Sequence, residues 1–221
     1  MTKNGGILMK ILALNGSPRK SWNTAILLNK ALEGAASQGA ETELLHLYDL
    51  QFKGCISCFE CKRLGGKSYG QCALKDDLKP ILQKAAEGDA ILLGSPIYLG
   101  AVTGVMHAFL ERLIFQYLAY NADHSSLFQK KIKTGFIYTL GAPEERMKQM
   151  DFDQPSQTNE WLLKFIFGES ESLLVNDTYQ FDDYSKYDTS GIDADAKEKR
   201  RQEVFPVDCQ KAYEMGRRLA E

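Results

Sequence analysis

The sequence has almost no excess of charge of either sign. Its 221 residues include 27 Lys and Arg against 29 Asp and Glu, for a formal net charge of −2. Proteins that bind nucleic acid or anionic membranes usually carry a basic excess, so we expect neither partner. No apolar run reaches the roughly 18 residues that a membrane span needs. The first apolar run breaks at Asn15-Gly16, which predicts a strand and not a signal-peptide core, and we expect a cytoplasmic protein.

Catalytic and nucleotide-binding signatures are also scarce. The three histidines, His46, His107 and His124, do not stand at metal-binding spacing. No Gly-x-Gly-x-x-Gly loop or Gly-x-x-x-x-Gly-Lys-Ser/Thr loop is present. His107 follows the loop that contains Tyr98 and could approach a site there, although a structural role is the simpler interpretation. Nothing in the sequence demands acid–base catalysis by the protein, which suits chemistry carried by a bound cofactor.

Apolar runs alternate with amphipathic stretches along the chain. We predict strands at 7–14, 41–47, 89–93, 132–140 and 172–180, and helices at 24–38, 76–86, 103–120 and 157–167. Such alternation predicts an α/β fold whose parallel sheet is covered on both faces. It fits a three-layer, doubly wound sandwich with five strands in the order 2-1-3-4-5, in which ligands bind at the carboxyl ends of the strands.

The chain is predicted to form one domain over residues 1–221, with 181–221 as a C-terminal helical extension. The charged stretch 194–203 predicts a solvated helix. The stretch 206–219 carries apolar residues at helical spacing and predicts a packing helix, in which Cys209 is a buried small side chain.

The first loop, residues 15–24, is rich in small, hydroxylated and basic residues and leads directly into a helix. A helix start exposes unpaired backbone N–H groups and the positive end of the helix dipole, and both favour phosphate. Side-chain donors and charges could be added by Ser17, Arg19, Lys20, Ser21, Asn23 and Thr24. The alternative is a βα turn whose polar residues serve only the helix.

Two further loops favour the phosphate-binding interpretation over the structural turn. Gly94-Ser95-Pro96-Ile97-Tyr98-Leu99-Gly100 follows the third predicted strand, and Gly141-Ala142-Pro143 follows the fourth. Parallel topology brings all three loops to one edge of the sheet. A planar ring with a polar edge and a phosphate tail would fit this constellation. Alternatively, Tyr98 only covers the edge of the sheet.

These three segments, in this order, resemble the NAD(P)H-dependent FMN reductase and iron–sulfur flavoprotein family, which has the flavodoxin fold. The resemblance covers roughly residues 7 to 145. It implies that FMN is the cofactor and NAD(P)H the co-substrate. It places Ser17, Arg19, Ser21, Asn23 and Thr24 around the FMN phosphate, and Pro96, Ile97, Tyr98, Leu99 and Gly100 along the isoalloxazine, with Gly141 nearby. The first loop lacks the glycine pattern that cradles a pyrophosphate, so FMN is expected and not FAD.

Four of the five cysteines form a compact motif, C-x2-C-x2-C-x10-C, at Cys55, Cys58, Cys61 and Cys72. Four thiolates at such spacing suit an iron–sulfur cluster, a [4Fe-4S] centre by the resemblance. Zinc usually draws on two separated pairs, which is a poorer fit. The interval after Cys61 is longer than in iron–sulfur flavoproteins. A cluster, a zinc ion and free thiols therefore all stay open at this point.

The resemblance implies an enzyme that passes electrons from NAD(P)H to a quinone, a nitro or azo compound, a flavin or an iron–sulfur acceptor. The alternatives are a flavodoxin-like electron carrier or iron–sulfur flavoprotein that does not oxidise NAD(P)H directly, and a flavin-free binding module. A homodimer or homotetramer is also expected, because the predicted helix at 103–120 has more apolar residues than one helix face needs. The C-terminal tail could cover that surplus instead.

Overall fold

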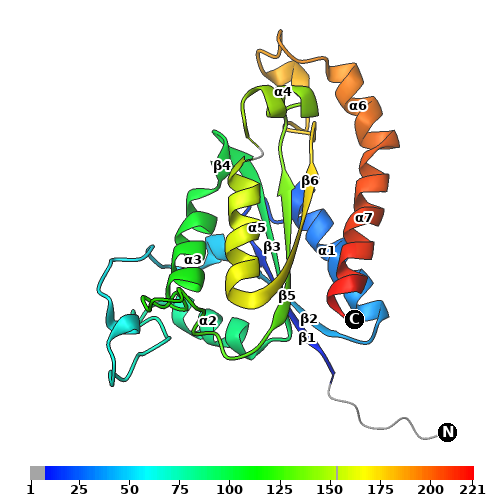
Figure 1. The fold of residues 1–221 in the computed structure, drawn as a ribbon. Coiled ribbons are helices and arrows are strands. Elements are labelled where there is room, and N and C mark those ends of the chain that lie inside the picture. Colours follow the sequence, from blue (N-terminus) through cyan, green and yellow to red (C-terminus); the bar gives the residue numbers. More distant parts are fainter. Residues whose placement is uncertain (1–7, 153) are drawn as a thin grey trace, which may run out of the picture.

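The structure is a computed structural model that describes residues 8–152 and 154–221 (Figure 1). Its strands are β1 (Lys10–Asn15), β2 (Glu41–His46), β3 (Ala90–Tyr98), β4 (Ala101–Val102), β5 (Ile132–Thr139) and β6 (Gly168–Val175). Its α-helices are α1 (Asn23–Ser37), α2 (Leu78–Glu87), α3 (Gly104–Phe115), α4 (Glu144–Gln149), α5 (Gln154–Phe167), α6 (Ala194–Glu203) and α7 (Phe205–Leu219). Short 3-10 turns occur at Leu47–Asp49, Glu60–Lys62 and Tyr184–Lys186. The first predicted strand began at Ile7, which lies outside the described residues.

The sheet has the order β2-β1-β3-β5-β6, and these five strands are parallel. The predicted order 2-1-3-4-5 and the flavodoxin-like fold are therefore confirmed. The predicted count of five was approximate, because β4 pairs antiparallel with the end of β3 and adds a short sixth strand. Leu99 and Gly100, with φ angles of 53° and 83°, make the turn between β3 and β4.

Several boundaries differ from the prediction. β3 continues to Tyr98, although the Gly94-Ser95-Pro96 sequence predicted an end at Leu93; Pro96 pairs in register with Thr139 of β5. β6 starts directly after α5 at Gly168, whose φ angle of 119° makes the turn, and it ends at Val175. Residues 176–180, predicted as strand, therefore form a loop, and α4 was not predicted.

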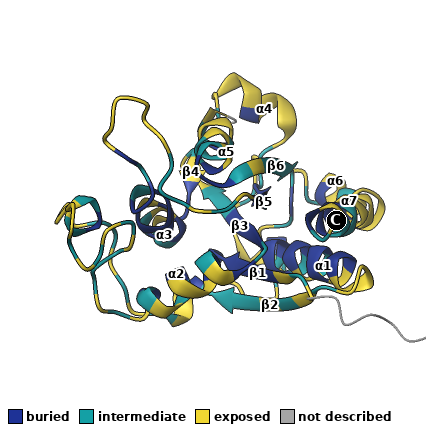
Figure 2. Ribbon diagram, turned by 60° about the horizontal axis from the view of Figure 1, so that its bottom comes forward, coloured by how far each residue is buried: buried dark blue, intermediate teal, exposed yellow. Residues whose placement is uncertain are grey.

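Alternate residues of the strands face two separate cores. Leu12 and Leu14 of β1 face α2, α3 and α5, whereas Ile11 and Ala13 face α1 and α7. This period of two is the reason that both faces of the sheet read as apolar in the sequence. Figure 2 shows α3 and α5 on one side of the sheet and α1 and α7 on the other.

The C-terminal tail is part of the three-layer core. α7 packs on α1 so closely that a Cβ at Gly216 would lie 1.7 Å from the Ala31 carbonyl oxygen. A Cβ at Gly34 would lie 2.0 Å from the carbonyl oxygen of Tyr213 on the opposite helix. Cys209, predicted to be buried, packs against this core but is only partly buried. Within the described residues, no helix is long and apolar enough to cross a membrane.

The apolar surplus predicted on the helix at 103–120 is covered inside the chain, and not by the tail. The buried members Phe109, Leu110, Leu113, Ile114 and Tyr117 all belong to the core between the sheet and α2, α3 and α5. α3 ends at Phe115, five residues before the predicted end. The helix therefore gives no support to the expected subunit interface.

Candidate functional site

The carboxyl ends of β1, β3 and β5 meet the segment after β6 around a cavity of about 250 Å³, which we call the carboxyl-edge pocket. This is the edge at which ligands bind in doubly wound folds. The pocket is lined by Ser17, Arg19, Trp22, Asn23, Thr24, Pro96, Ile97, Tyr98, Thr139, Leu140, Gly141, Thr178, Tyr179, Gln180 and Phe181. Residues from four separate parts of the chain therefore share one site.

The first loop is folded by its own side chains. The buried Asn15 accepts a hydrogen bond through Oδ1 from the Ser17 backbone N–H at 2.8 Å. The Ser17 hydroxyl accepts one from the Arg19 N–H at 3.2 Å. The 15-residue helix α1 then begins with Trp22 at its N-cap, and no side chain caps the first-turn N–H groups. An uncapped helix start beside a cavity is suited to hold an anion.

Several polar side chains of this loop hold the segment after β6. Asn23 donates from Nδ2 to the Tyr179 carbonyl oxygen at 2.7 Å, and Trp22 donates from Nε1 to the same oxygen at 3.2 Å. Arg19 donates from Nη1 to the Gln180 carbonyl oxygen at 2.6 Å. Asn23 also accepts from Arg201 of α6 at 2.9 Å. Asn23 therefore shapes the pocket by fixing its opposite wall.

The structure brings eight of the eleven predicted cofactor-binding residues to this pocket: Ser17, Arg19, Asn23, Thr24, Pro96, Ile97, Tyr98 and Gly141. Ser21, Leu99 and Gly100 do not line it; Ser21 and Leu99 are exposed, and Gly100 lies in the turn before β4. His107 lies outside it as well, on the exposed face of α3 beside Glu111. Residues 178–181 were missed because the sequence predicted a strand that ends at Gln180. The rule that ligands bind beyond strand ends would have found them had β6 been placed correctly.

A buried lysine from the C-terminal tail braces the pocket. Lys197 of α6 is 7% exposed and donates to the Gly141 carbonyl oxygen at 2.5 Å and to that of Thr178 at 3.5 Å. Its ammonium group also forms an ion pair with Asp177. The ammonium group of Lys197 therefore connects the loop after β5 to the loop after β6. No sequence signal marked this residue, because a single lysine in a highly charged stretch reads as solvated.

The four clustered cysteines surround a second, much smaller cavity of about 20 Å³, which we call the thiol cavity. Cys61 is buried, Cys55 and Cys72 are partly buried, and Cys58 is exposed. Positive φ angles at Ser57 (54°) and Phe59 (55°) turn the chain on both sides of Cys58. Burial raises the pKa of the Cys61 thiol, and the nearby Lys62 acts in the opposite direction. The sequence correctly grouped these cysteines in one place.

The C-terminal half of α3 and Gln116, the residue that follows it, hold both ends of the cysteine loop. Glu111 accepts the Cys55 backbone N–H at 2.9 Å, and Gln116 accepts the Cys72 N–H at 2.8 Å. Arg112, whose side chain is fully buried, donates from Nε to Cys72 Sγ at 3.3 Å and is bidentate to Asp76 at 2.5 and 2.9 Å. Burial alone would raise the pKa of Asp76, but the hydrogen bond and charge of Arg112 hold it below its usual value.

The thiol cavity is lined by the donor type that both metal interpretations require. Thiolates are the ligands of iron–sulfur clusters and also of structural zinc sites, and all four cysteines line this cavity. In the described part of the chain, no three His, Cys, Asp or Glu side chains are arranged to hold one metal ion. The thiol cavity and the carboxyl-edge pocket have no lining residue in common.

The fold and the carboxyl-edge pocket define a flavodoxin-like protein with a cavity at the edge of the sheet where doubly wound folds bind ligands. Residues 9–146 match the NADPH-dependent FMN reductase family, and the chain belongs to this family of flavin oxidoreductases. Iron–sulfur flavoproteins of Methanocaldococcus jannaschii and Archaeoglobus fulgidus are 39% and 41% identical over 104 residues, which is 47% of this chain and 51% and 48% of theirs. The chain therefore spans about half the length of these curated relatives.

Solved structures support the fold over almost the whole chain. An NAD(P)H:quinone oxidoreductase from Methanothermobacter marburgensis aligns with a TM-score of 0.71 at 15% identity, and covers 96% of this chain and 100% of its own. An FMN-dependent NADH-azoreductase from Bacillus anthracis, in complex with FMN, aligns with a TM-score of 0.66 at 14% identity and the same coverage. At such identities the likeness establishes the architecture only.

Proposed function

We propose that this protein binds FMN in the carboxyl-edge pocket and passes electrons from NAD(P)H to a small-molecule acceptor. The observation that carries the proposal is the meeting of an uncapped helix start with the ends of β3 and β5 and the segment 178–181 around one pocket. Membership of the FMN reductase family supports it. Candidate acceptors are a quinone, a nitro or azo compound, a flavin or an iron–sulfur centre.

In this proposal the first turn of α1 and the side chains of Ser17, Arg19 and Thr24 hold the phosphate. Thr24 is 2% exposed, and its hydroxyl is hydrogen-bonded to that of Thr139 at 2.8 Å, so the loop after β1 is tied to the end of β5. Pro96 to Tyr98 form one wall for the ring, and 178–181 form the opposite wall. Bound FMN would supply hydride acceptance, and the protein would supply orientation and backbone hydrogen bonds.

An absorbance spectrum of protein purified without air, followed by steady-state oxidation of NADPH and NADH, tests this function. Flavin bands together with NAD(P)H oxidation support the proposed enzyme. Flavin bands without NAD(P)H oxidation favour the electron-carrier alternative. A colourless protein that does not take up added FMN contradicts the proposal.

A second candidate, an iron–sulfur flavoprotein, is supported by the four cysteines that line the thiol cavity and by the names of the relatives. Cys55, Cys58, Cys61 and Cys72 would hold the cluster. Assays of iron and sulfide on anaerobic protein and on a Cys58→Ala variant decide between the two. About four irons per chain, lost in the variant, is the expectation for a [4Fe-4S] centre with four cysteine ligands. Absence of iron with intact FMN binding leaves the plain flavin reductase.

We also propose that the chain forms a homodimer or homotetramer that covers the rim of the carboxyl-edge pocket. Two large side chains at this rim are exposed, Leu99 completely and Tyr98 to 49%. Exposed apolar side chains that adjoin one another often mark interfaces. Sedimentation as a monomer at micromolar concentration would contradict this proposal.

A further inference from the structure

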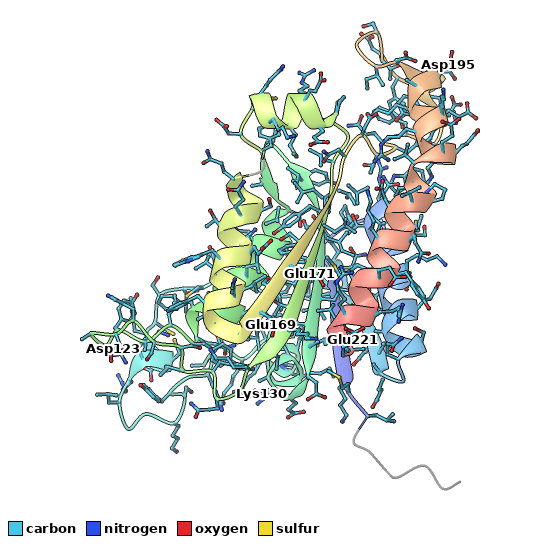
Figure 3. All side chains as sticks on the ribbon, turned by 45° about the vertical axis from the view of Figure 1, so that its right-hand side comes forward. Asp123, Lys130, Glu169, Glu171, Asp195 and Glu221 are labelled. Atoms are coloured by element: carbon cyan, nitrogen blue, oxygen red, sulfur yellow. The ribbon has the colours of Figure 1, made fainter. Side chains whose placement is uncertain are left out.

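A cavity of about 530 Å³ lies between α2, the end of α3 and residues 127–130, away from the carboxyl-edge pocket. We call it the amino-end cavity, because Lys130 in its wall lies near the amino-terminal ends of the strands. Figure 3 shows Lys130 at the opposite end of the molecule from Asp195 of α6. A volume of this size falls in the range of small-molecule sites, about 300–1,000 Å³.

The floor of the amino-end cavity is apolar and partly aromatic. Leu82 is 4% exposed and Tyr117 is 7% exposed, and the Tyr117 ring meets the Phe128 ring edge-on with centroids 5.0 Å apart. A tyrosine hydroxyl is neutral at pH 7, and burial raises the pKa of Tyr117 further, to about 12. A flat apolar ligand could rest against these side chains without placing a charge beside an ionised phenol.

The rim of the amino-end cavity carries more positive than negative charge. Lys79 and Lys130 are set against a single carboxylate, Glu87. The Lys130 ammonium donates to the backbone carbonyl oxygens of Glu87 and Gly88 at 3.0 and 2.6 Å. Among the described residues, the ammonium group of Lys79, a partly buried residue, has no hydrogen-bond or ion-pair partner. A cation of this kind at the rim of a hollow favours an anionic ligand.

Cys72 and Gln116 line both the amino-end cavity and the thiol cavity. A ligand in the larger cavity would therefore contact the wall of the cysteine site. We propose that the amino-end cavity binds a planar aromatic anion, such as an aromatic sulfonate or carboxylate, held by Lys79 against the Leu82–Tyr117 floor. This site is separate from the flavin site of the proposed function, so the two can fail independently.

Calorimetric titration of the purified protein with naphthalene-2-sulfonate, in the presence and in the absence of FMN, tests the proposal. The uncharged naphthalene-2-sulfonamide is the matched ligand. We expect one site per chain, with the sulfonate bound about tenfold or more tightly than the sulfonamide, as one charge-assisted contact would give. Lys79→Gln should weaken sulfonate binding about tenfold and leave sulfonamide binding unchanged.

Lys84→Gln is the control, because Lys84 lies on the same helix, pairs with Glu43 at 2.7 Å and does not line the cavity. Its sulfonate affinity should equal that of the wild type. Gln83→Glu, which adds a negative charge to the rim, should also weaken sulfonate binding and carries the test if Lys79→Gln does not fold. Equal affinity for the two ligands, no binding, or equal losses in the Lys79 and Lys84 variants would overturn the proposal. The proposal would also be overturned if the sulfonate shifts the flavin spectrum and its affinity is the same in Lys79→Gln as in the wild type.

Discussion

Replacement of Gly216 by Ala should separate α7 from α1 and destabilise the protein. The new Cβ would lie 1.7 Å from the Ala31 carbonyl oxygen, and real Cβ contacts essentially never fall below 3.0 Å. The two backbones must therefore move apart by about 3.0 − 1.7 = 1.3 Å. Overpacking typically costs about 1–3 kcal/mol, and we take the upper end, about 3 kcal/mol, because the obstacle here is rigid backbone. Replacing Gly by Ala within a helix gains about 1 kcal/mol in helix propensity, so we expect a net loss of about 2 kcal/mol in unfolding free energy.

Urea unfolding of the FMN-free protein, followed by circular dichroism, measures this loss. Gly104→Ala in α3 is the matched control, because a Cβ there meets nothing within 4 Å, and it should be neutral or stabilising by up to about 1 kcal/mol. FMN affinity should also fall in Gly216→Ala, since α1 carries the first loop of the pocket. Wild-type stability in Gly216→Ala would refute the argument that the C-terminal tail is part of the core.

Three other changes test the site and its surroundings. Lys197→Met should lower FMN affinity and reduce the unfolding free energy by about 2–3 kcal/mol. This loss is smaller than for a fully buried ion pair, because the partner carboxylate of Lys197 is 28% exposed. Titration with FMN and urea unfolding measure the two effects, and unchanged values would contradict the role of Lys197 in holding the pocket. Asp76→Asn leaves Arg112 without its counter-charge, so the variant should have a lower free energy of unfolding than the wild type. Because the pKa of Asp76 is depressed in the folded protein, this difference should be full above about pH 5 and should shrink as the pH falls below the unfolded Asp pKa of about 3.9. A deficit independent of pH would refute this assignment. In metal-free protein, iodoacetamide should modify the exposed Cys58 faster than the buried Cys61, whose thiol pKa is raised by burial; peptide mass spectrometry gives the order, and equal rates would contradict it.

The sheet order and one edge of the site could be predicted from the sequence, because buried parallel strands are continuous apolar runs and their carboxyl ends must share an edge. The cysteines could be grouped from the sequence for a different reason, because their short spacing keeps them close together in space. The wall at 178–181 was missed because the predicted strand was carried on to Gln180, although the polar pair Asn176-Asp177 directly after Val175 marks the point where β6 ends. The role of Lys197 depends on tertiary packing of α6 over loops distant in sequence, and local patterns do not encode it.

The separation of the thiol cavity from the carboxyl-edge pocket was also beyond the sequence. The loop after β2 leaves the carboxyl edge, as the topology required, but its cysteines pack along the C-terminal half of α3. That course depends on the buried Arg112 and its partner Asp76. In the sequence, an arginine within an apolar helix predicts an exposed position. Only the structure shows that the side chain of Arg112 is fully buried.

The central claim, a flavin phosphate site at the start of α1, is tested most directly by fluorescence titration of the apoprotein with FMN and with riboflavin, which lacks the phosphate. We predict that wild type binds FMN about 100-fold or more tightly than riboflavin, as two charge-assisted contacts would give. Arg19→Ala should reduce that ratio about tenfold or more. Lys20→Ala is the control and should preserve it, because Lys20 pairs with Asp49 at 2.5 Å and does not line the pocket. Equal affinity of wild type for FMN and riboflavin, or a ratio unchanged in Arg19→Ala, would contradict the claim.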